Sequence, residues 1–237
     1  FTDYFLPDNN GIIQYITNLY EDIINKKKTK ISILTFKTNN SLKNYEKIGK
    51  FEIYRVKAKS ILGGTYNIPN IFDWKKISKK LKNKKFDVVN THTRFFISSV
   101  LGTWFANRNK IKHVHTEHGA MFVPHPNLVV KTCARIFDET FGRFVMRSSN
   151  IVSPVSKKGI LFCKKLGAKK IQVVENGISK NFKKIKIVLN KKINLNKKLN
   201  ICFVGRIVEA KGVSDLIEVC LKLKFDYNLF IIGDGNY

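Results

Sequence analysis

A chain of 237 residues that is 43% hydrophobic and 26% charged can bury a sizeable core, which excludes an intrinsically disordered protein. Its formal net charge of +27 comes almost entirely from lysine spread along the whole chain, whereas arginine, the better reader of bases and phosphates, is scarce. This pattern favours compositional drift over a nucleic-acid-binding patch. A basic face would still be attracted to anionic lipid.

The cysteines and the longest apolar stretch indicate a cytoplasmic protein. Cysteines 133, 163, 202 and 220 form neither a CxxC motif nor an even framework, which favours reduced, buried thiols. The apolar stretch at 95–106 is too short to span a bilayer and is expected to be a core helix. No signal peptide and no initiator Met are visible.

Strand and helix patterns alternate over residues 1–180, which predicts a Rossmann-like, doubly wound parallel sheet with helices on both faces. Residues 1–5, FTDYF, read as the end of a first strand. The further strands are expected at Lys30–Phe36, Phe51–Val56, Phe86–Asn90, Ile111–Thr116, Ile151–Pro154 and Ile171–Val174. The helices are expected at Ile12–Asn25, Trp74–Leu81, Phe95–Ala106, Leu128–Met146 and Ser156–Leu166.

A second domain is expected to begin after a lysine-rich linker at 181–199. Residues 200–237 read as a βαβ unit, with strands at Ile201–Val204 and Leu229–Ile232 and a helix at Val213–Leu223. Two strands and one crossover helix cannot bury both faces of a sheet, so this second Rossmann-like domain is expected to be incomplete. The chain is therefore interpreted as a fragment with sequence missing at both ends.

The loop of this βαβ unit carries a candidate phosphate site. Gly205, Arg206, Lys211 and Gly212 form G-R-x4-K-G between a strand and a helix. The glycines permit close backbone approach, the helix offers unpaired amides, and the two cations stand beside them, which suits a diphosphate. The alternative is a structural loop with solvated Arg and Lys, and the spacing alone favours neither. The strand that ends in Gly233–Gly235 favours the anion site.

The segment FVGRIVEAKGVSDLIE, followed by LFIIGDG, resembles the start of the C-terminal domain of GT-B glycosyltransferases of family 4, also called group 1. Weaker motifs of that family recur in the expected order through most of the chain. These are Pro7–Leu19, His118-Gly119, Glu139 in the long helix, Val155-Ser156, and Glu175–Ile178, where Ser179 replaces the usual acid.

The resemblance implies transfer of a sugar from a nucleotide-sugar to a glycan or lipid-linked acceptor, with retention at the anomeric carbon. Arg206 and Lys211 would stabilise the leaving diphosphate in place of a metal ion, and His118 would contact the donor sugar or its phosphate. No metal and no cofactor are expected, because the nucleotide-sugar is a substrate. The residues expected to bind the donor or its phosphate, besides these, are Gly11, Gly205, Gly233 and Gly235, and those expected to contact substrate are His92 and Asn176.

Two departures from the family pattern limit these expectations. At the N-terminal loop, Asn10 stands on the first glycine of the family motif, and Ile13 stands where an acid or amide is usual, with Gln14 one position late. The E-x7-E element with which this family binds the nucleotide-sugar donor would lie beyond Tyr237. The 237-residue chain is therefore expected to be inactive alone.

The histidines between 92 and 125 allow a metal interpretation. His113 and His115 share one face of an expected strand and His118 follows it, so three imidazoles could bind zinc. Because only Glu117 stands near to orient them, His113 and His115 are interpreted as structural, with no metal. For His92 a core or loop role is as well supported as a substrate contact. Asn176-Gly177 is equally consistent with a simple turn.

Two other functions remain open at this point. A sugar-nucleotide epimerase shares the GT-B architecture, although the G-R-x4-K-G spacing argues against it. A basic module without enzymatic activity would bind nucleic acid or membrane; the aromatic residues are mostly at core positions rather than among basic clusters, which disfavours nucleic acid. Peripheral association with the anionic inner face of the membrane is also expected. The sugar, the nucleotide base, the acceptor, the linkage and the oligomeric state do not follow from the sequence.

Overall fold

The computed structural model describes residues 1–8, 10–27, 29–37, 39–61, 66–123, 127–177 and 199–235. The chain divides into two compact units, Phe1–Phe182 and Lys183–Tyr237. The expected linker at 181–199 lies outside the described residues, apart from its last residue.

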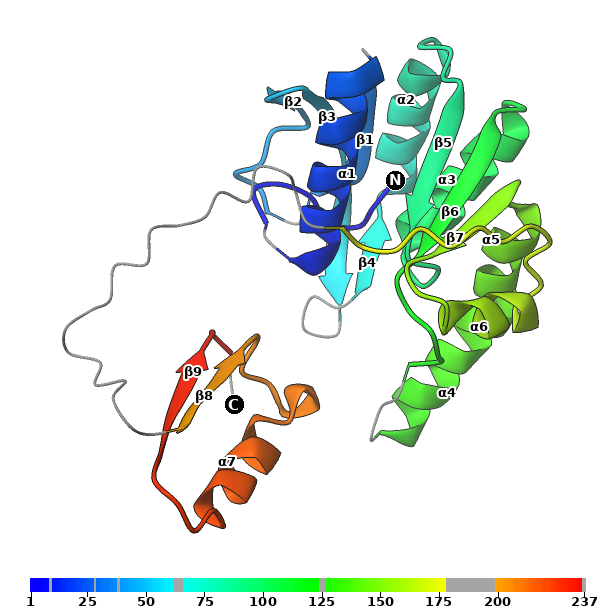
Figure 1. Ribbon diagram of the computed structural model, residues 1–237. Coiled ribbons are helices and arrows are strands. Elements are labelled where there is room, and N and C mark those ends of the chain that lie inside the picture. The colour runs from blue at the N-terminus through cyan, green and yellow to red at the C-terminus, as the bar shows by residue number, and fades with distance from the viewer. Residues whose placement is uncertain are drawn as a thin grey trace. The chain divides into compact units, whose positions relative to one another are not determined.

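The first unit is built on parallel strands. β1 (Ile31–Lys37) pairs in parallel with β3 (Phe51–Ile61). β5 (Val88–His92), β6 (Lys112–Glu117) and β7 (Ile151–Pro154) form a second parallel set in that order (Figure 1). These pairings confirm the predicted α/β class with parallel strands.

The opening residues join the two sets of strands. The Thr2 N–H donates to the Leu34 carbonyl of β1 at 3.1 Å, and the His92 N–H of β5 donates to the Phe1 carbonyl at 3.1 Å. Bonds to a neighbour on each side are those of a strand within a sheet. Residues 1–2 therefore lie between β1 and β5 with the backbone bonds of a strand, as expected for the end of a strand at 1–5, although no regular strand forms there (Figure 1).

Two short strands were not predicted from the sequence. β2 (Tyr45–Ile48) and β4 (Tyr66–Pro69) both pair with β3 in antiparallel orientation, so the sheet is mixed rather than wholly parallel. Four residues are too few to establish a period, and these strands form because β3 offers them backbone partners. The strand predicted at Ile171–Val174 is reduced to one bridge between Ile171 and Val152.

The helices lie close to the predicted positions. They are α1 (Gly11–Lys27), α2 (Ile71–Lys82), α3 (Ile97–Arg108), α4 (Leu128–Phe137), α5 (Arg143–Ser148) and α6 (Gly159–Lys165), with a π-helical turn at Asp138–Gly142. This turn makes α4, Asp138–Gly142 and α5 one continuous helical stretch, as predicted for Leu128–Met146. No helix among the described ranges is both long and apolar enough to cross a bilayer.

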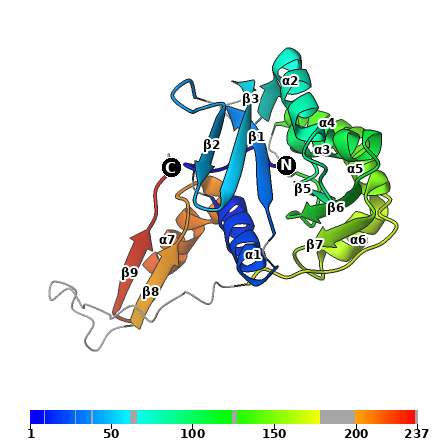
Figure 2. The same cartoon turned by 90° about the horizontal axis from the view of Figure 1, so that it is seen from above.

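Side chains alternate between two cores on opposite faces of the sheet. Ile13 and Ile16 of α1 pack with Ile33 of β1 on one face. Leu34, the next residue of β1, packs with Trp74 of α2 and residues of α3 on the other. This alternation follows from the two-residue period of a strand and confirms helices on both faces, which Figure 2 shows from above.

The second unit has the predicted βαβ form. β8 (Leu199–Val204) and β9 (Tyr227–Ile232) are parallel, and α7 (Val213–Leu221) connects them after a short 3-10 turn at Glu209–Lys211. The prediction of buried cysteines was only half right. All four thiols are free, but Cys133 and Cys202 are exposed.

Candidate functional site

Two of the predicted histidines meet where strands of the first unit end. His92 is the buried last residue of β5, and His118 follows the last residue of β6. The carboxyl ends of neighbouring parallel strands lie at the same edge of a sheet, where ligands bind in open α/β sheets. The Nδ1 atom of His92 lies 3.3 Å from Nε2 of His118, within hydrogen-bond distance. The structure thus brings together two residues predicted from separate motifs.

Helix α1 adds two tyrosines to this pair. The Tyr20 hydroxyl lies 3.3 Å from Nε2 of His92. The ring of Tyr15 packs edge-on against His118, with 5.0 Å between ring centroids. Neither tyrosine was predicted as a site residue, because their only signal in the sequence was a place on the apolar side of the helix. We call Tyr15, Tyr20, His92 and His118 the His–Tyr cluster.

Burial keeps the two imidazoles of the cluster uncharged. It lowers the pKa of His118 to about 4, although the nearby Glu117 carboxylate acts in the opposite direction. It also holds the pKa of His92 well below the ordinary value. At neutral pH His118 therefore offers a ligand a hydrogen-bonding group rather than a positive charge.

A buried ion network underlies the strand ends. Arg94 is 1% exposed and donates to Glu117 Oε1 and Asp138 Oδ2, both at 2.9 Å. Its guanidinium also donates to the Met121 carbonyl at 2.9 Å and stacks 4.4 Å from the centre of the Phe162 ring. One arginine therefore ties the loop after β5 to β6, to the π-helical turn and to α6.

Glu117 fixes the position of the residues around His118. Burial raises its pKa, but a hydrogen bond from His115 and the charge of Arg94 outweigh burial and bring the pKa to about 2. The ionised carboxylate accepts from the Gly119 N–H at 2.7 Å and the Arg94 N–H at 3.1 Å. His118 lies between Glu117 and Gly119 in the chain. The hydrogen bonds of the Glu117 carboxylate fix both of these neighbours, and with them the backbone of His118.

The glutamate singled out in the long helix lies apart from this network. Glu139 accepts from Arg135 at 2.8 Å and from Arg143 at 2.5 Å along the helix surface. The preceding residue, Asp138, is the one that turns inward to Arg94. No motif marked Arg94 or Asp138, because their pairing depends on contacts between distant segments.

The remaining described histidines belong to the core. His113 and His115 both lie within hydrogen-bond distance of the Thr91 hydroxyl, at 2.9 and 2.8 Å. His115 also reaches Glu117 Oε2 at 3.2 Å. No group of three or more metal-ligating side chains is found within the described ranges, which do not include His125.

Gly11 begins α1 behind a capping residue. The Asn10 side-chain oxygen accepts from the N–H groups of Ile12 and Ile13, both at 3.0 Å. An added Cβ at Gly11 would meet nothing within 4 Å, so packing within the chain does not require a glycine there.

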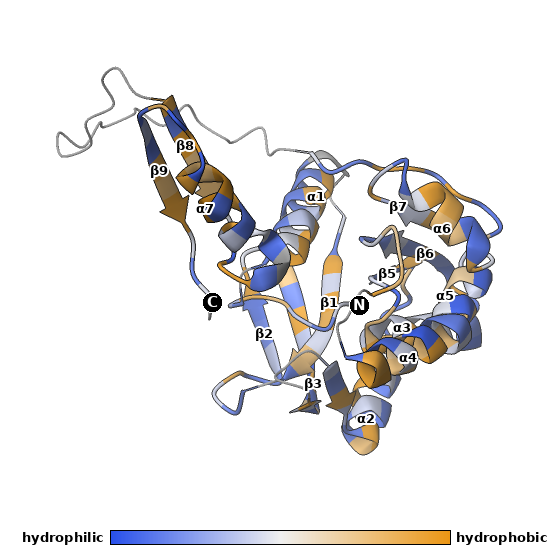
Figure 3. Ribbon diagram, turned by 90° about the horizontal axis from the view of Figure 1, so that it is seen from below, coloured by the Kyte–Doolittle hydropathy of each residue, from blue (hydrophilic) through white to orange (hydrophobic). Residues whose placement is uncertain are grey.

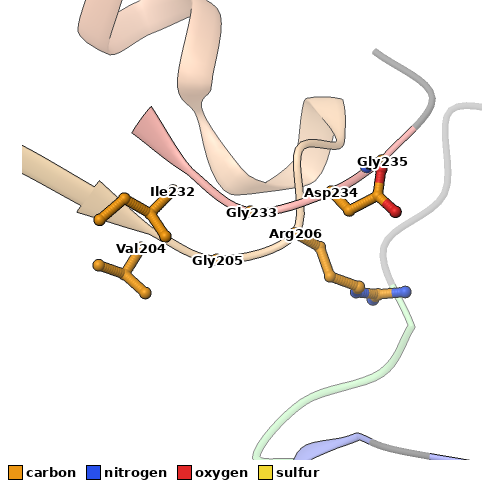
Figure 4. Close-up of a pocket in the computed structure, with 7 residues that line it drawn as sticks. All are labelled: Val204, Gly205, Arg206, Ile232, Gly233, Asp234 and Gly235. Carbon is orange, nitrogen blue, oxygen red and sulfur yellow. Dashed lines mark hydrogen bonds between the residues drawn. The ribbon is translucent and has the colours of Figure 1, made fainter. Parts of the chain in front are cut away.

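The second unit contains a hollow of about 680 Å³ at the ends of β8 and β9 (Figure 4). It is lined by Val204, Gly205, Arg206, Ile232, Gly233, Asp234 and Gly235. The Arg206 side chain extends from the loop to the same side as Asp234 (Figure 4). No described residue makes a hydrogen bond or ion pair with the Arg206 guanidinium, which leaves it available to an anion.

Two glycines of this hollow are required by close backbone approach. A Cβ at Gly233 would lie 1.8 Å from the Gly205 carbonyl oxygen, and one at Gly235 would lie 1.9 Å from the Ile207 carbonyl oxygen. Neither distance is possible, whereas a Cβ at Gly205 would meet only the Phe203 ring at 3.5 Å. Gly233 and Gly235 let the two strand ends run side by side and form the floor of the hollow.

The other predicted site residues are not gathered with these. Lys211 is exposed at the end of the 3-10 turn and is not among the residues that line the hollow. Gly212 follows with a φ of +68°, a left-handed conformation that favours glycine. Asn176 is exposed in an irregular segment of the first unit.

Comparison with known proteins agrees with the sequence motifs. Residues 9–182 match the model of the family described as Glycosyltransferase Family 4. The chain is 28% identical over 255 aligned positions to an uncharacterized glycosyltransferase of Methanocaldococcus jannaschii. It is 23% identical over 254 positions to alpha-monoglucosyldiacylglycerol synthase of Acholeplasma laidlawii. Each alignment covers 99% of this chain and 62% of the relative, so the chain spans less than two thirds of their length.

Solved structures show the same fold. HepE of Anabaena in complex with UDP matches with a TM-score of 0.68 and 12% identity, over 100% of this chain and 60% of HepE. Sucrose-phosphate synthase of Thermosynechococcus elongatus matches with a TM-score of 0.67 and 16% identity, over 94% and 57% of the two chains. These matches identify the fold as GT-B. Because the family model covers most of it, the chain belongs to glycosyltransferase family 4.

Proposed function

We propose that the full-length protein transfers a sugar from a nucleotide-sugar to a glycan or lipid-linked acceptor, with retention at the anomeric carbon. The observation that carries this proposal is the hollow in the second unit whose floor is formed by Gly233 and Gly235. Arg206 lines this hollow and has no hydrogen-bond or ion-pair partner among the described residues. A nucleoside diphosphate gains negative charge as it leaves the sugar, and a fixed guanidinium can stabilise that charge. The neutral His118 supplies a hydrogen bond to the donor.

The relatives suggest which donor and acceptor to test first. HepE of Anabaena has been solved with UDP and with UDP-glucose, and the relative from Acholeplasma laidlawii is named as a synthase of a glucosylated diacylglycerol. We therefore propose UDP-glucose as the first donor and diacylglycerol as the first acceptor. Arg206, assisted by Lys211 and the start of α7, would replace a divalent ion.

Glucosyl transfer by the full-length protein tests this function. UDP-glucose and diacylglycerol vesicles are supplied with and without EDTA, and the glucolipid and the released UDP are quantified. Transfer at equal rates with and without the chelator is expected. Loss of transfer with EDTA and recovery with Mg²⁺ would show that a metal stabilises the diphosphate. Interconversion of the nucleotide-sugar without acceptor would support an epimerase instead.

We further propose peripheral contact with the anionic inner face of the membrane through α2. The first two residues of this helix, Ile71 and Phe72, are 50% and 77% exposed, although both are apolar. Exposed lysines follow them at 75, 76 and 79. Apolar residues beside lysines suit the boundary between lipid headgroups and acyl chains, and Figure 3 shows both kinds on α2.

Reversing three charges on α2 is expected to abolish most of this contact. Each basic residue near an anionic surface contributes on the order of 1 kcal/mol, so Lys75→Glu, Lys76→Glu and Lys79→Glu together should weaken vesicle binding roughly a hundredfold or more. Vesicle binding is measured by co-sedimentation with vesicles of anionic and of neutral lipid, at low and high salt. The control reverses three exposed lysines around α6, at 157, 158 and 164. Equal losses in both variants would mean that the attraction is not specific to α2.

A further inference from the structure

Three side chains of the His–Tyr cluster form one continuous chain of hydrogen bonds. Tyr20 of α1 reaches His92 at the end of β5, and His92 reaches His118 after β6, with 3.3 Å at each step. The second nitrogen of His118, Nδ1, has no hydrogen-bond partner among the described residues. The direction in which the protons are donated along this chain therefore decides what His118 offers to a ligand.

The direction follows from the first member. Burial raises the pKa of Tyr20, so its hydroxyl keeps its proton. Nε2 of His92 is the only hydrogen-bond partner of this hydroxyl in the described part of the chain. If Tyr20 accepted instead, its own proton would be left without an acceptor among the described residues, which has a cost in this partly buried position. Tyr20 therefore donates to Nε2 of His92.

The tautomers of the two imidazoles are then determined. A neutral imidazole has one N–H and one acceptor nitrogen. His92 accepts at Nε2, so its proton is on Nδ1 and is donated to Nε2 of His118. His118 in turn accepts at Nε2 and carries its proton on the free Nδ1.

We propose that Tyr20 and His92 are positioning residues, which hold His118 in the tautomer whose Nδ1–H donates to an oxygen atom of the bound donor. This inference rests on the proposed function for the identity of the ligand, whereas the tautomers themselves can be measured without any ligand. In the opposite tautomer, the Nδ1 lone pair of His118 would accept from a sugar hydroxyl but would face the lone pairs of a phosphate oxygen. Fixing the proton in advance avoids that repulsion.

Nitrogen NMR of the chain labelled with 15N-histidine tests the relay directly. Nitrogens with and without a proton have well-separated chemical shifts, and couplings to the ring protons assign Nδ1 and Nε2. Assignment uses the loss of one set of signals in each histidine variant. We expect Nδ1–H for both His92 and His118 at neutral pH. An Nε2–H or doubly protonated His118 would overturn the proposal.

Removing the first donor separates a relay from simple packing. Tyr20→Phe keeps the ring but removes the proton donor, so we expect His92 and His118 to populate both tautomers. Tyr15→Phe is the matched control: Tyr15 packs against the same imidazoles and has no hydrogen bond to either among the described residues. Unchanged tautomers in Tyr20→Phe, or equal changes in both variants, would overturn the assignment of Tyr20.

Ligand titration identifies the oxygen atom. In the labelled full-length protein, a shift of His118 Nδ1–H with UDP alone points to a phosphate oxygen, and a shift with UDP-glucose only points to a sugar hydroxyl. No shift with saturating UDP-glucose would overturn the donor contact and leave the relay itself standing.

Kinetics of the full-length protein show whether the relay matters for transfer. We expect Tyr20→Phe to lower kcat/KM about fivefold, the effect of one neutral hydrogen bond of ordinary strength. His92→Asn, whose amide can still donate to His118, should retain more activity than His92→Leu. Equal losses in the two His92 variants would contradict a role for His92 as a hydrogen-bond donor.

Discussion

Replacing Arg206 by alanine in the full-length protein is expected to lower kcat roughly a hundredfold or more. The guanidinium stands at the hollow without a partner among the described residues, so its removal leaves the departing diphosphate without its fixed positive charge. Loss of one preorganised group that stabilises charge in the transition state commonly has an effect of this size. Single-turnover measurement of UDP release separates this chemical step from donor binding.

Three further variants test this role. Arg206→Lys keeps a positive charge but loses the planar pair of donors, so we expect partial activity. Lys222→Ala removes an exposed cation that follows the far end of α7 and should leave kcat unchanged. The kcat of Lys211→Ala shows whether Lys211 also stabilises the departing diphosphate, although Lys211 does not line the hollow. Full activity of Arg206→Ala would contradict the proposed role of this residue.

Replacing Arg94 by methionine is expected to reduce the free energy of unfolding of the first unit by about 3–5 kcal/mol. The change leaves the carboxylates of Glu117 and Asp138 buried without their cation, and loss of one partner of a buried ion pair typically has an effect of this size. His118 should also lose its fixed position, because Glu117 holds the residues on both sides of it.

Denaturant unfolding followed by tryptophan fluorescence measures this effect. Both tryptophans, Trp74 and Trp104, lie in the first unit, so the signal reports on that unit. Arg143→Met is the control, because its ion pair with Glu139 lies at the surface, is screened by solvent and should contribute much less than the buried pairs. If Arg94→Met does not fold, Asp138→Asn removes one charge and keeps an acceptor, and should unfold at intermediate denaturant concentration. A loss no larger than that of Arg143→Met would contradict a stabilising network.

Features that depend on neighbouring residues could be predicted from the sequence. The βαβ unit of the second half, the long helix around residue 140 and the alternation of strands and helices all follow from short-range periodicity. The glycine-rich turn at Gly233–Gly235 was recognisable because only glycine permits the backbone approach seen there. The order of the motifs was sufficient to indicate the family.

Which side chains meet depends on how the chain packs in three dimensions. Arg94 lies 23 residues from Glu117 and 44 from Asp138, and Tyr20 lies 72 residues from His92. No local pattern marks such pairs, because the order of the strands in the sheet determines them. The antiparallel β2 and β4 were missed for the same reason, since β3 supplies their backbone partners. Local sequence patterns indicated most of the elements and the family, and the packing of the sheet determined the environment of His118.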